Sequence, residues 1–105
     1  MNDKVYALIG LAQKAGRLVS GENACIIDIK KGKSELVIIA EDSSDNTKKQ
    51  FKNMCGYRNI PVVVFGTKAL LGKYTGKGYR AVICVKDHHF ARSIIQKLSG
   101  GEAFV

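Results

Sequence analysis

The sequence predicts an α/β fold, a three-layer α/β/α sandwich around a mostly four-stranded mixed sheet. Apolar residues at helical spacing alternate along the chain with short, continuous apolar runs. The run Leu36–Ala40 has no polar residue on either face, which is typical of a strand covered on both sides. The 105 residues contain no linker, repeat or low-complexity segment, so we expect a single domain over residues 1–105.

The first part of the chain predicts two helices joined by a short strand. Apolar residues within 5–12 follow helical spacing, and Gly16 is suited to end that helix. A strand over 18–20 leads into a second helix over about 21–31. Ser20 is the expected N-cap of this second helix, because serine hydroxyls accept hydrogen bonds from the first free N–H groups.

The second part of the chain repeats the alternation of helices and strands. Pro61 begins a strand, where its missing backbone N–H does least harm. The expected elements are, in order, a helix after candidate N-caps in 43–47, a strand over 62–65, a short helix capped by Thr67 that runs through Tyr74, a glycine-rich loop from Gly72 to Arg80, a strand over 81–85, and a helix capped by Asp87 that ends at Gly100 and Gly101.

The basic residues are concentrated in one part of the sequence. The net charge is +8, and residues 43–105 hold eleven basic and three acidic side chains, whereas residues 1–42 hold six of each. Such an excess on a small domain favours a polyanionic partner, nucleic acid first, although solvated surface charge is the alternative. No apolar run reaches the length of a membrane span and no secretory pattern begins the chain, so we expect a soluble, cytoplasmic protein that does not bind membranes.

The cysteines and histidines do not form a recognisable metal or catalytic motif. Cys25, Cys55 and Cys84 lie far apart in apolar stretches, which predicts small buried side chains and neither a metal nor a cofactor. His88 and His89 follow the expected cap Asp87 and read as surface residues. The Glu41-Asp42 pair ends a strand where enzymes often place catalytic groups, but without a nucleophile or a partnering histidine we expect it to cap a loop and the protein not to be an enzyme.

Three segments in this order resemble a known family: LAQKAGRLVS (11–20), GENACIIDIKKGKSELVIIAED (21–42) and NIPVVVFGTKALLG (59–72). They are similar to the kink-turn-binding ribosomal proteins of the archaeal L7Ae and L30e type, and especially to the small bacterial YlxQ-like branch. The resemblance covers roughly Val5 to Leu98. It implies a non-enzymatic, ribosome-associated RNA-binding domain whose partner is a structured RNA, ribosomal or regulatory, or the ribosomal subunit itself, and we expect it to act as a monomer.

The predicted start of the second helix is the first candidate site. The free N–H groups of Gly21, Glu22 and Asn23, together with the helix dipole, favour an anionic partner. In the family this helix begins with a Gly-x-Asn-Glu pattern that reads a kinked RNA, with a lysine about one turn later. Gly21 and Asn23 match, but Ala24 and Ile27 stand where the family has glutamate and lysine, so we expect recognition mainly by shape and backbone charge. A protein-interaction adaptor on the same fold, or a capped helix start without a ligand, remains an alternative.

The predicted loop from Gly72 to Arg80 is the second candidate site. It interleaves three cations with two tyrosines, which suits contact with phosphates and stacking on an unpaired base, although a solvated basic loop has the same composition. Its glycines lack the spacing of a nucleotide-binding P-loop. The expected RNA-binding residues are Lys14, Arg17, Gly21, Glu22, Asn23, Lys30, Lys31, Lys73, Lys77, Tyr79 and Arg80.

Overall fold

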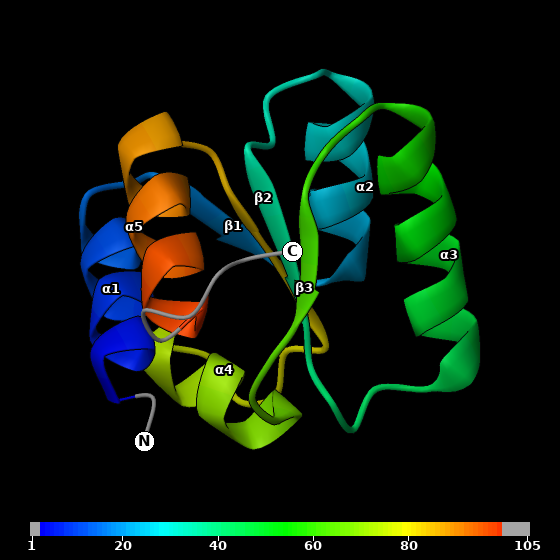
Figure 1. Ribbon diagram of the computed structural model, residues 1–105. Coiled ribbons are helices and arrows are strands. Elements are labelled where there is room, and N and C mark those ends of the chain that lie inside the picture. The colour runs from blue at the N-terminus through cyan, green and yellow to red at the C-terminus, as the bar shows by residue number, and fades with distance from the viewer. Residues whose placement is uncertain (1–2, 100–105) are drawn as a thin grey trace.

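A four-stranded mixed sheet forms the middle layer of the protein, whose computed structural model describes residues 3–99 (Figure 1). The strand order is β1-β4-β2-β3, in which β2 and β3 are parallel and the other pairs antiparallel. The predicted fold class is confirmed. The elements are α1 (Asp3–Lys14), β1 (Leu18–Ser20), α2 (Glu22–Lys30), β2 (Leu36–Ile39), α3 (Asp45–Tyr57), β3 (Val62–Val64), α4 (Lys68–Tyr74), β4 (Val82–Val85) and α5 (His88–Ser99).

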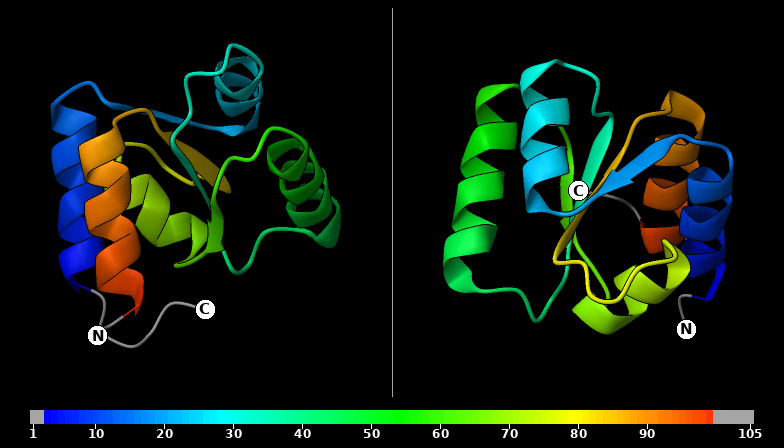
Figure 2. Two further views of the ribbon diagram at one scale, coloured as in Figure 1. Left: turned by 45° about the horizontal axis from the view of Figure 1, so that its top comes forward. Right: turned by 180° about the vertical axis from the view of Figure 1, so that it is seen from behind.

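Alternate residues of the central strand β2 enter two different hydrophobic cores. Leu36 and Ile38 pack with α1, α4 and α5, whereas Val37 and Ile39 pack with α2 and α3. Figure 2 shows these two groups of helices on opposite faces of the sheet. All four side chains are fully buried, which confirms the prediction of a strand covered on both sides.

The predicted helix caps are present at three helix starts. Ser44 Oγ accepts a hydrogen bond from the Thr47 N–H at 3.1 Å, and Thr67 Oγ1 accepts one from the Leu70 N–H at 3.2 Å. Asp87 Oδ2 accepts one from the Phe90 N–H at 2.9 Å. Each bond satisfies one of the N–H groups that a helix start leaves free. The predicted end of α5 at Gly100 and Gly101 lies outside the described residues.

The start of α2 differs from the prediction. Gly21, not Ser20, is the N-cap, and its φ of 96° and ψ of 150° belong to a region that only glycine enters easily. No side chain caps this helix, and the Ser20 hydroxyl instead accepts a hydrogen bond from Arg80 Nε at 3.0 Å. The expected Ser20 cap is therefore wrong, because the backbone of Gly21 begins the helix one residue later.

The basic loop is shorter and more closely attached than the sequence suggests. α4 continues to Tyr74, so the loop covers only 75–80. Lys77 N–H donates to the Gly72 carbonyl at 2.8 Å and Arg80 N–H to the Lys68 carbonyl at 3.0 Å, which ties the loop back along α4. Gly72 makes this possible, because a Cβ at that position would overlap the backbone of Gly78.

The three cysteines are free and buried, as predicted. The pKa of the Cys25 thiol is raised, chiefly by a hydrogen bond with Cys84 and next by burial. Burial also raises the pKa of the Cys55 thiol to about 11. Within residues 3–99, no group of histidine, cysteine and carboxylate side chains is arranged to hold a metal ion. No helix of this described part is long and apolar enough to cross a membrane.

Candidate nucleic-acid interface

A shallow depression of about 470 Å³ lies at the start of α2. It joins segments that are about 60 residues apart in the sequence, because the antiparallel pairing of β1 with β4 places the residues after Ser20 beside those before Ile83. Five of the eleven expected RNA-binding residues meet here. The lining residues are Gly21, Glu22, Asn23, Lys68, Tyr79, Arg80 and Ala81.

The Arg80 side chain is fixed beside the first residue of this helix start. Its Nε donates to Ser20 Oγ at 3.0 Å, and its Nη1 donates to the Tyr79 carbonyl at 2.9 Å. A Cβ added at Gly21 would lie 3.8 Å from Arg80 Nε, so the cation lies directly against the α2 N-terminus. Two hydrogen bonds on one half-buried guanidinium restrict its rotamers, so the positive charge is held in place before any ligand arrives.

The backbone N–H groups at this helix start are only partly satisfied. The Gly21 N–H donates to the Val82 carbonyl at 2.9 Å, so the expectation that it is free is wrong. The N–H groups of Glu22, Asn23 and Ala24 have no acceptor among residues 3–99. They form the positive end of the helix dipole and lie next to the Arg80 guanidinium. Since Arg80 and Lys68 outnumber the one carboxylate of the lining, Glu22, the depression suits an anion.

Lys68 is a lining residue that the sequence interpretation did not include. It is the first residue of α4, and its N–H donates to Asp42 Oδ1 at 2.8 Å. Asp42 therefore holds the start of α4, as expected of a residue that caps a loop. The predicted Thr67 cap already placed a helix start at the same end of the sheet as Asp42, and this signal could have identified Lys68.

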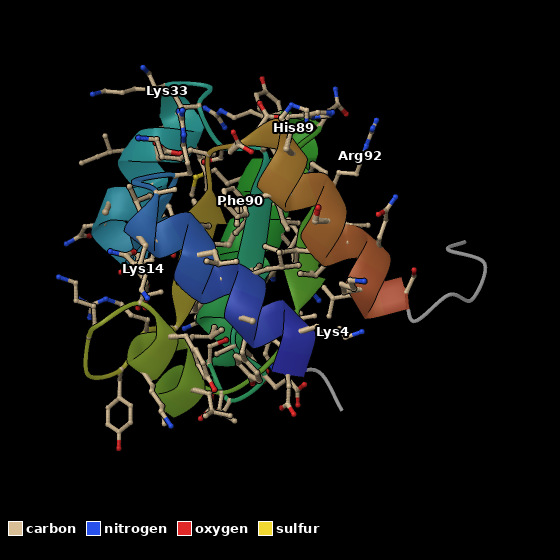
Figure 3. The ribbon with its side chains drawn as sticks, turned by 90° about the vertical axis from the view of Figure 1, so that its left-hand side faces the viewer. Lys4, Lys14, Lys33, His89, Phe90 and Arg92 are labelled. Atoms are coloured by element: carbon tan, nitrogen blue, oxygen red, sulfur yellow. The ribbon has the colours of Figure 1, made fainter. Side chains whose placement is uncertain are left out.

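A larger groove of about 880 Å³ runs between α1 and the end of α4. Three exposed lysines, Lys14, Lys73 and Lys77, line it together with the apolar side chain of Leu11. Figure 3 shows Lys14 on the part of α1 next to the loop that follows α4. The 73–80 segment therefore borders this groove on one side and the depression at the start of α2 on the other.

The remaining expected cations lie at other places. Lys30 and Lys31 are at the far end of α2, and a helix of nine residues is about 13 Å long. Arg17 lines a separate depression with Lys33 and Lys86. The structure thus places eight of the expected residues around the 73–80 segment and three at the opposite end of the molecule.

The two positions that depart from the family pattern both face solvent. Ala24 is exposed on the first turns of α2, and the side chain of Ile27 is 56% exposed. A polar side chain can therefore replace Ile27 without entering either hydrophobic core. Since both positions lie on the helix that begins at the depression, side chains there can reach a ligand bound to it.

The adjacent histidines have a surface position, as predicted. His88 and His89 are exposed at the start of α5, and His88 Nδ1 lies 3.7 Å from Glu35 Oε1. The neighbouring cap Asp87 has its pKa lowered, chiefly by the hydrogen bond from the Phe90 N–H. These residues are distant from the start of α2, so they take no part in the depression.

Comparison with known proteins gives a consistent set of relatives. The model of the ribosomal protein L7Ae/L30e/S12e/Gadd45 family matches residues 3–95. The RNA-binding protein YlxQ of Bacillus subtilis is 38% identical to this chain over 93 residues, which cover 89% of this chain and 93% of that protein. The RNA-binding protein YlxQ of Enterococcus faecium is 36% identical over 97 residues, which cover 92% of this chain and 93% of that protein. The structure of a Bacillus halodurans protein of unknown function superposes with a TM-score of 0.85 at 39% identity, covering 89% of this chain and 94% of the other.

Proposed function

This chain belongs to the ribosomal protein L7Ae/L30e/S12e/Gadd45 family, and we propose that it is an RNA-binding protein that holds a structured RNA against the start of α2. Two relatives that cover nearly the whole chain are named RNA-binding proteins, and none of the reported relatives is named as an enzyme. This supports a non-enzymatic role in a ribonucleoprotein, with ribosomal RNA as the first candidate ligand. The protein is proposed to act as a monomer.

The observation that carries this proposal is the Arg80 guanidinium held beside an uncapped helix start. Phosphate oxygens can accept hydrogen bonds from the free N–H groups of Glu22 to Ala24 and, at the same time, from Arg80. Lys68 lines the same depression and Lys77 lines the groove on the other side of the 73–80 segment, and both can neutralise neighbouring phosphates. A bound phosphate would also relieve the repulsion between the guanidinium and the positive end of the helix dipole.

The same depression offers groups that can contact bases. Asn23 and Glu22 are exposed at its rim, and their side chains can form hydrogen bonds with base edges. Tyr79 is 72% exposed and can stack on an unpaired base. Because Ala24 and Ile27 cannot supply the base contacts of glutamate and lysine, we propose that the protein recognises a kink-turn-like RNA mainly by its shape and backbone, with weak discrimination among base sequences.

One observation favours a second function. Ile27 exposes an apolar side chain on the surface of α2, where an RNA contact would gain more from a polar residue. A protein-interaction adaptor that kept the scaffold and lost kink-turn reading would present such a residue to a protein partner. RNA binding and its dependence on Arg80 separate the two functions.

The experiment is a fluorescence titration of a labelled kink-turn RNA and of a straight RNA duplex with the protein and the variant Arg80→Gln. Loss of one charge-assisted phosphate contact, worth about 1.5–3 kcal/mol, predicts affinity for the kink-turn RNA that is lower by roughly 10-fold to 100-fold. With about five cations near the RNA, the affinity of the parent should fall by about two to three powers of ten between 50 and 200 mM salt. Lys52→Gln removes one exposed charge from α3 and serves as the matched control.

An Arg80→Gln variant that binds the kink-turn RNA as tightly as the parent would show that the start of α2 is not the RNA site. Binding that does not depend on salt, or no binding at low salt, would contradict an RNA-binding function as a whole. In that case the adaptor function would be favoured.

A further inference from the structure

The end of the molecule opposite the α2 start carries a second concentration of cations. Glu35, in the connection just before β2, borders three separate depressions at this end. Basic side chains line each of them, and Figure 3 shows Lys33, His89 and Arg92 spread over this end of the molecule. The cations that gather around Glu35 are Arg17, Lys30, Lys33, Arg58, Lys86 and Arg92, and Lys31 follows Lys30 at the end of α2.

Stabilisation of helix ends does not account for most of this charge. Lysine in the last turn of a helix interacts favourably with the negative end of its dipole, and this explains Lys30 in α2. Arg17 and Lys33, however, follow the glycines after α1 and α2, and Arg92 lies in the first half of α5. None of these three residues belongs to the last turn of a helix, although Arg17 interacts electrostatically with Asp87, the cap of α5, and helps to lower its pKa.

The carboxylates at this end leave most of the cations unpaired. Asp28 is buried, accepts a hydrogen bond from Ser34 Oγ at 2.6 Å and lies 3.8 Å from Lys86 Nζ. Glu35 Oε1 lies 3.7 Å from His88 Nδ1, a contact that is an ion pair only when the imidazole is protonated. Among the residues that the structure describes, no carboxylate oxygen lies within 4 Å of the charged nitrogens of Arg17, Lys30, Lys31, Lys33, Arg58 or Arg92.

We propose that this basic end is a second RNA-binding surface that takes the phosphate backbone of an RNA helix, so that one molecule joins two RNA segments. The proposal builds on the proposed function, since it adds a second RNA to the one bound at the start of α2. Phosphate contacts are made by both lysine and arginine, whereas protein–protein interfaces favour arginine and aromatic residues and are depleted in lysine, so the lysines of this end favour RNA. Among the described residues, no phenylalanine or tyrosine side chain lines any of the three depressions.

The geometry lets both surfaces bind at once. α2 runs from the first surface to the second, and its nine residues separate them by about 13 Å of helix. The molecule measures 32 × 29 × 26 Å along its principal axes, so an RNA at one end leaves the other end open. The protein therefore acts as a short connector between two RNA segments, and base sequence is not read at the second surface.

The test uses a kink-turn RNA labelled with a donor dye and a separate RNA duplex labelled with an acceptor dye, both mixed with the protein at 100 mM salt. We expect energy transfer with the parent. The variant Arg17→Gln/Lys33→Gln/Arg92→Gln removes three exposed charges that have no carboxylate within 4 Å. Joining the two RNAs should require a concentration of this variant at least about tenfold higher than that of the parent, while its affinity for the kink-turn RNA alone stays within about threefold of the parent. The matched control, Lys49→Gln/Lys52→Gln/Lys97→Gln, has the same net charge and should join them as the parent does.

The proposal is overturned if the first triple variant joins the two RNAs as well as the parent, which is the result expected of a surface for an acidic protein. It is also overturned if the control loses joining to the same extent, because net charge alone would then explain the effect. Arg80→Gln separates this proposal from the function proposed above, since it should bind the kink-turn RNA roughly 10-fold to 100-fold more weakly and the duplex as the parent does. Melting temperatures of all variants within a few degrees of the parent establish that each one is folded.

Discussion

Gly72 offers the sharpest test of how the fold positions the candidate RNA site. It is buried inside α4, where the backbone of the 75–80 loop packs directly against it. A Cβ at this position would overlap the Gly78 carbonyl oxygen and would lie 2.6 Å from its carbonyl carbon and 3.0 Å from the Tyr79 nitrogen. These neighbours are backbone atoms, so Gly72→Ala can be accommodated only if the loop moves away from the helix.

The expected size of the effect follows from what the loop would lose. Inserting a methyl group into a packed site costs about 1–3 kcal/mol, and alanine recovers about 1 kcal/mol through its higher helix propensity. Displacement also weakens the hydrogen bonds from Lys77 N–H to Gly72 and from Arg80 N–H to Lys68, each worth about 0.5–1.5 kcal/mol. The net loss of unfolding free energy should be about 1–3 kcal/mol, and RNA affinity should fall as well because Arg80 moves with the loop.

Gly56→Ala is the matched control, because it makes the same chemical change inside α3, where nothing lies within 4 Å of the new Cβ. It should raise the unfolding free energy by up to about 1 kcal/mol and leave RNA binding unchanged. Urea denaturation measures both variants, with the RNA titration run in parallel. If Gly72→Ala is as stable as Gly56→Ala and binds RNA normally, the loop is not held against α4 as described, and the derived position of Arg80 is refuted.

Two further predictions concern the family pattern and the cysteines. The double variant Ala24→Glu/Ile27→Lys should raise the affinity for a kink-turn RNA relative to a straight duplex by at least about fivefold, since each new side chain offers base contacts worth about 1–3 kcal/mol. A folded double variant without this gain would show that α2 does not face RNA. Because burial raises the pKa of Cys55 from 9.0 to about 11, iodoacetamide at pH 8 should modify this thiol about 100-fold more slowly in the native protein than in urea, and comparable rates would contradict its burial. Because the pKa of Cys55 is higher in the folded protein, its contribution to the unfolding free energy is fully present below pH 9 and is lost as the pH rises through about 11.

The element order could be predicted from the sequence because its signals are local. Apolar spacing, the caps Thr67 and Asp87 and the terminating Gly16 each act within a few residues, and the structure confirms them. The Ser20 cap failed for a reason that is not local. Its hydroxyl is engaged by Arg80, 60 residues away, and the helix start is set by the backbone of Gly21.

The predicted site residues stay a prediction, and the sequence could not show which of them lie together. Arg17, Lys30 and Lys31 are near the first site along the chain, yet the length of α2 separates the lysines from Gly21, and Arg17 faces another depression. Lys68 is far away along the chain and still lines the first site. Position along the chain is therefore a poor guide to which cations lie together, because successive helices and strands carry the chain back and forth between the two ends of the molecule.

The register between β1 and β4 is what assembles the first site. Ser20 lies opposite Ile83, and the Gly21 N–H continues the pairing by donating to Val82, so the antiparallel direction brings Arg80 to the helix start. A shift of one residue would turn the alternating core residues of β4 toward the wrong layers, so the two hydrophobic cores enforce this register. The burial that stabilises the sheet thus also places the cation beside the free N–H groups, and the hydrogen bonds of the Arg80 side chain with Ser20 and with the Tyr79 carbonyl then hold it there.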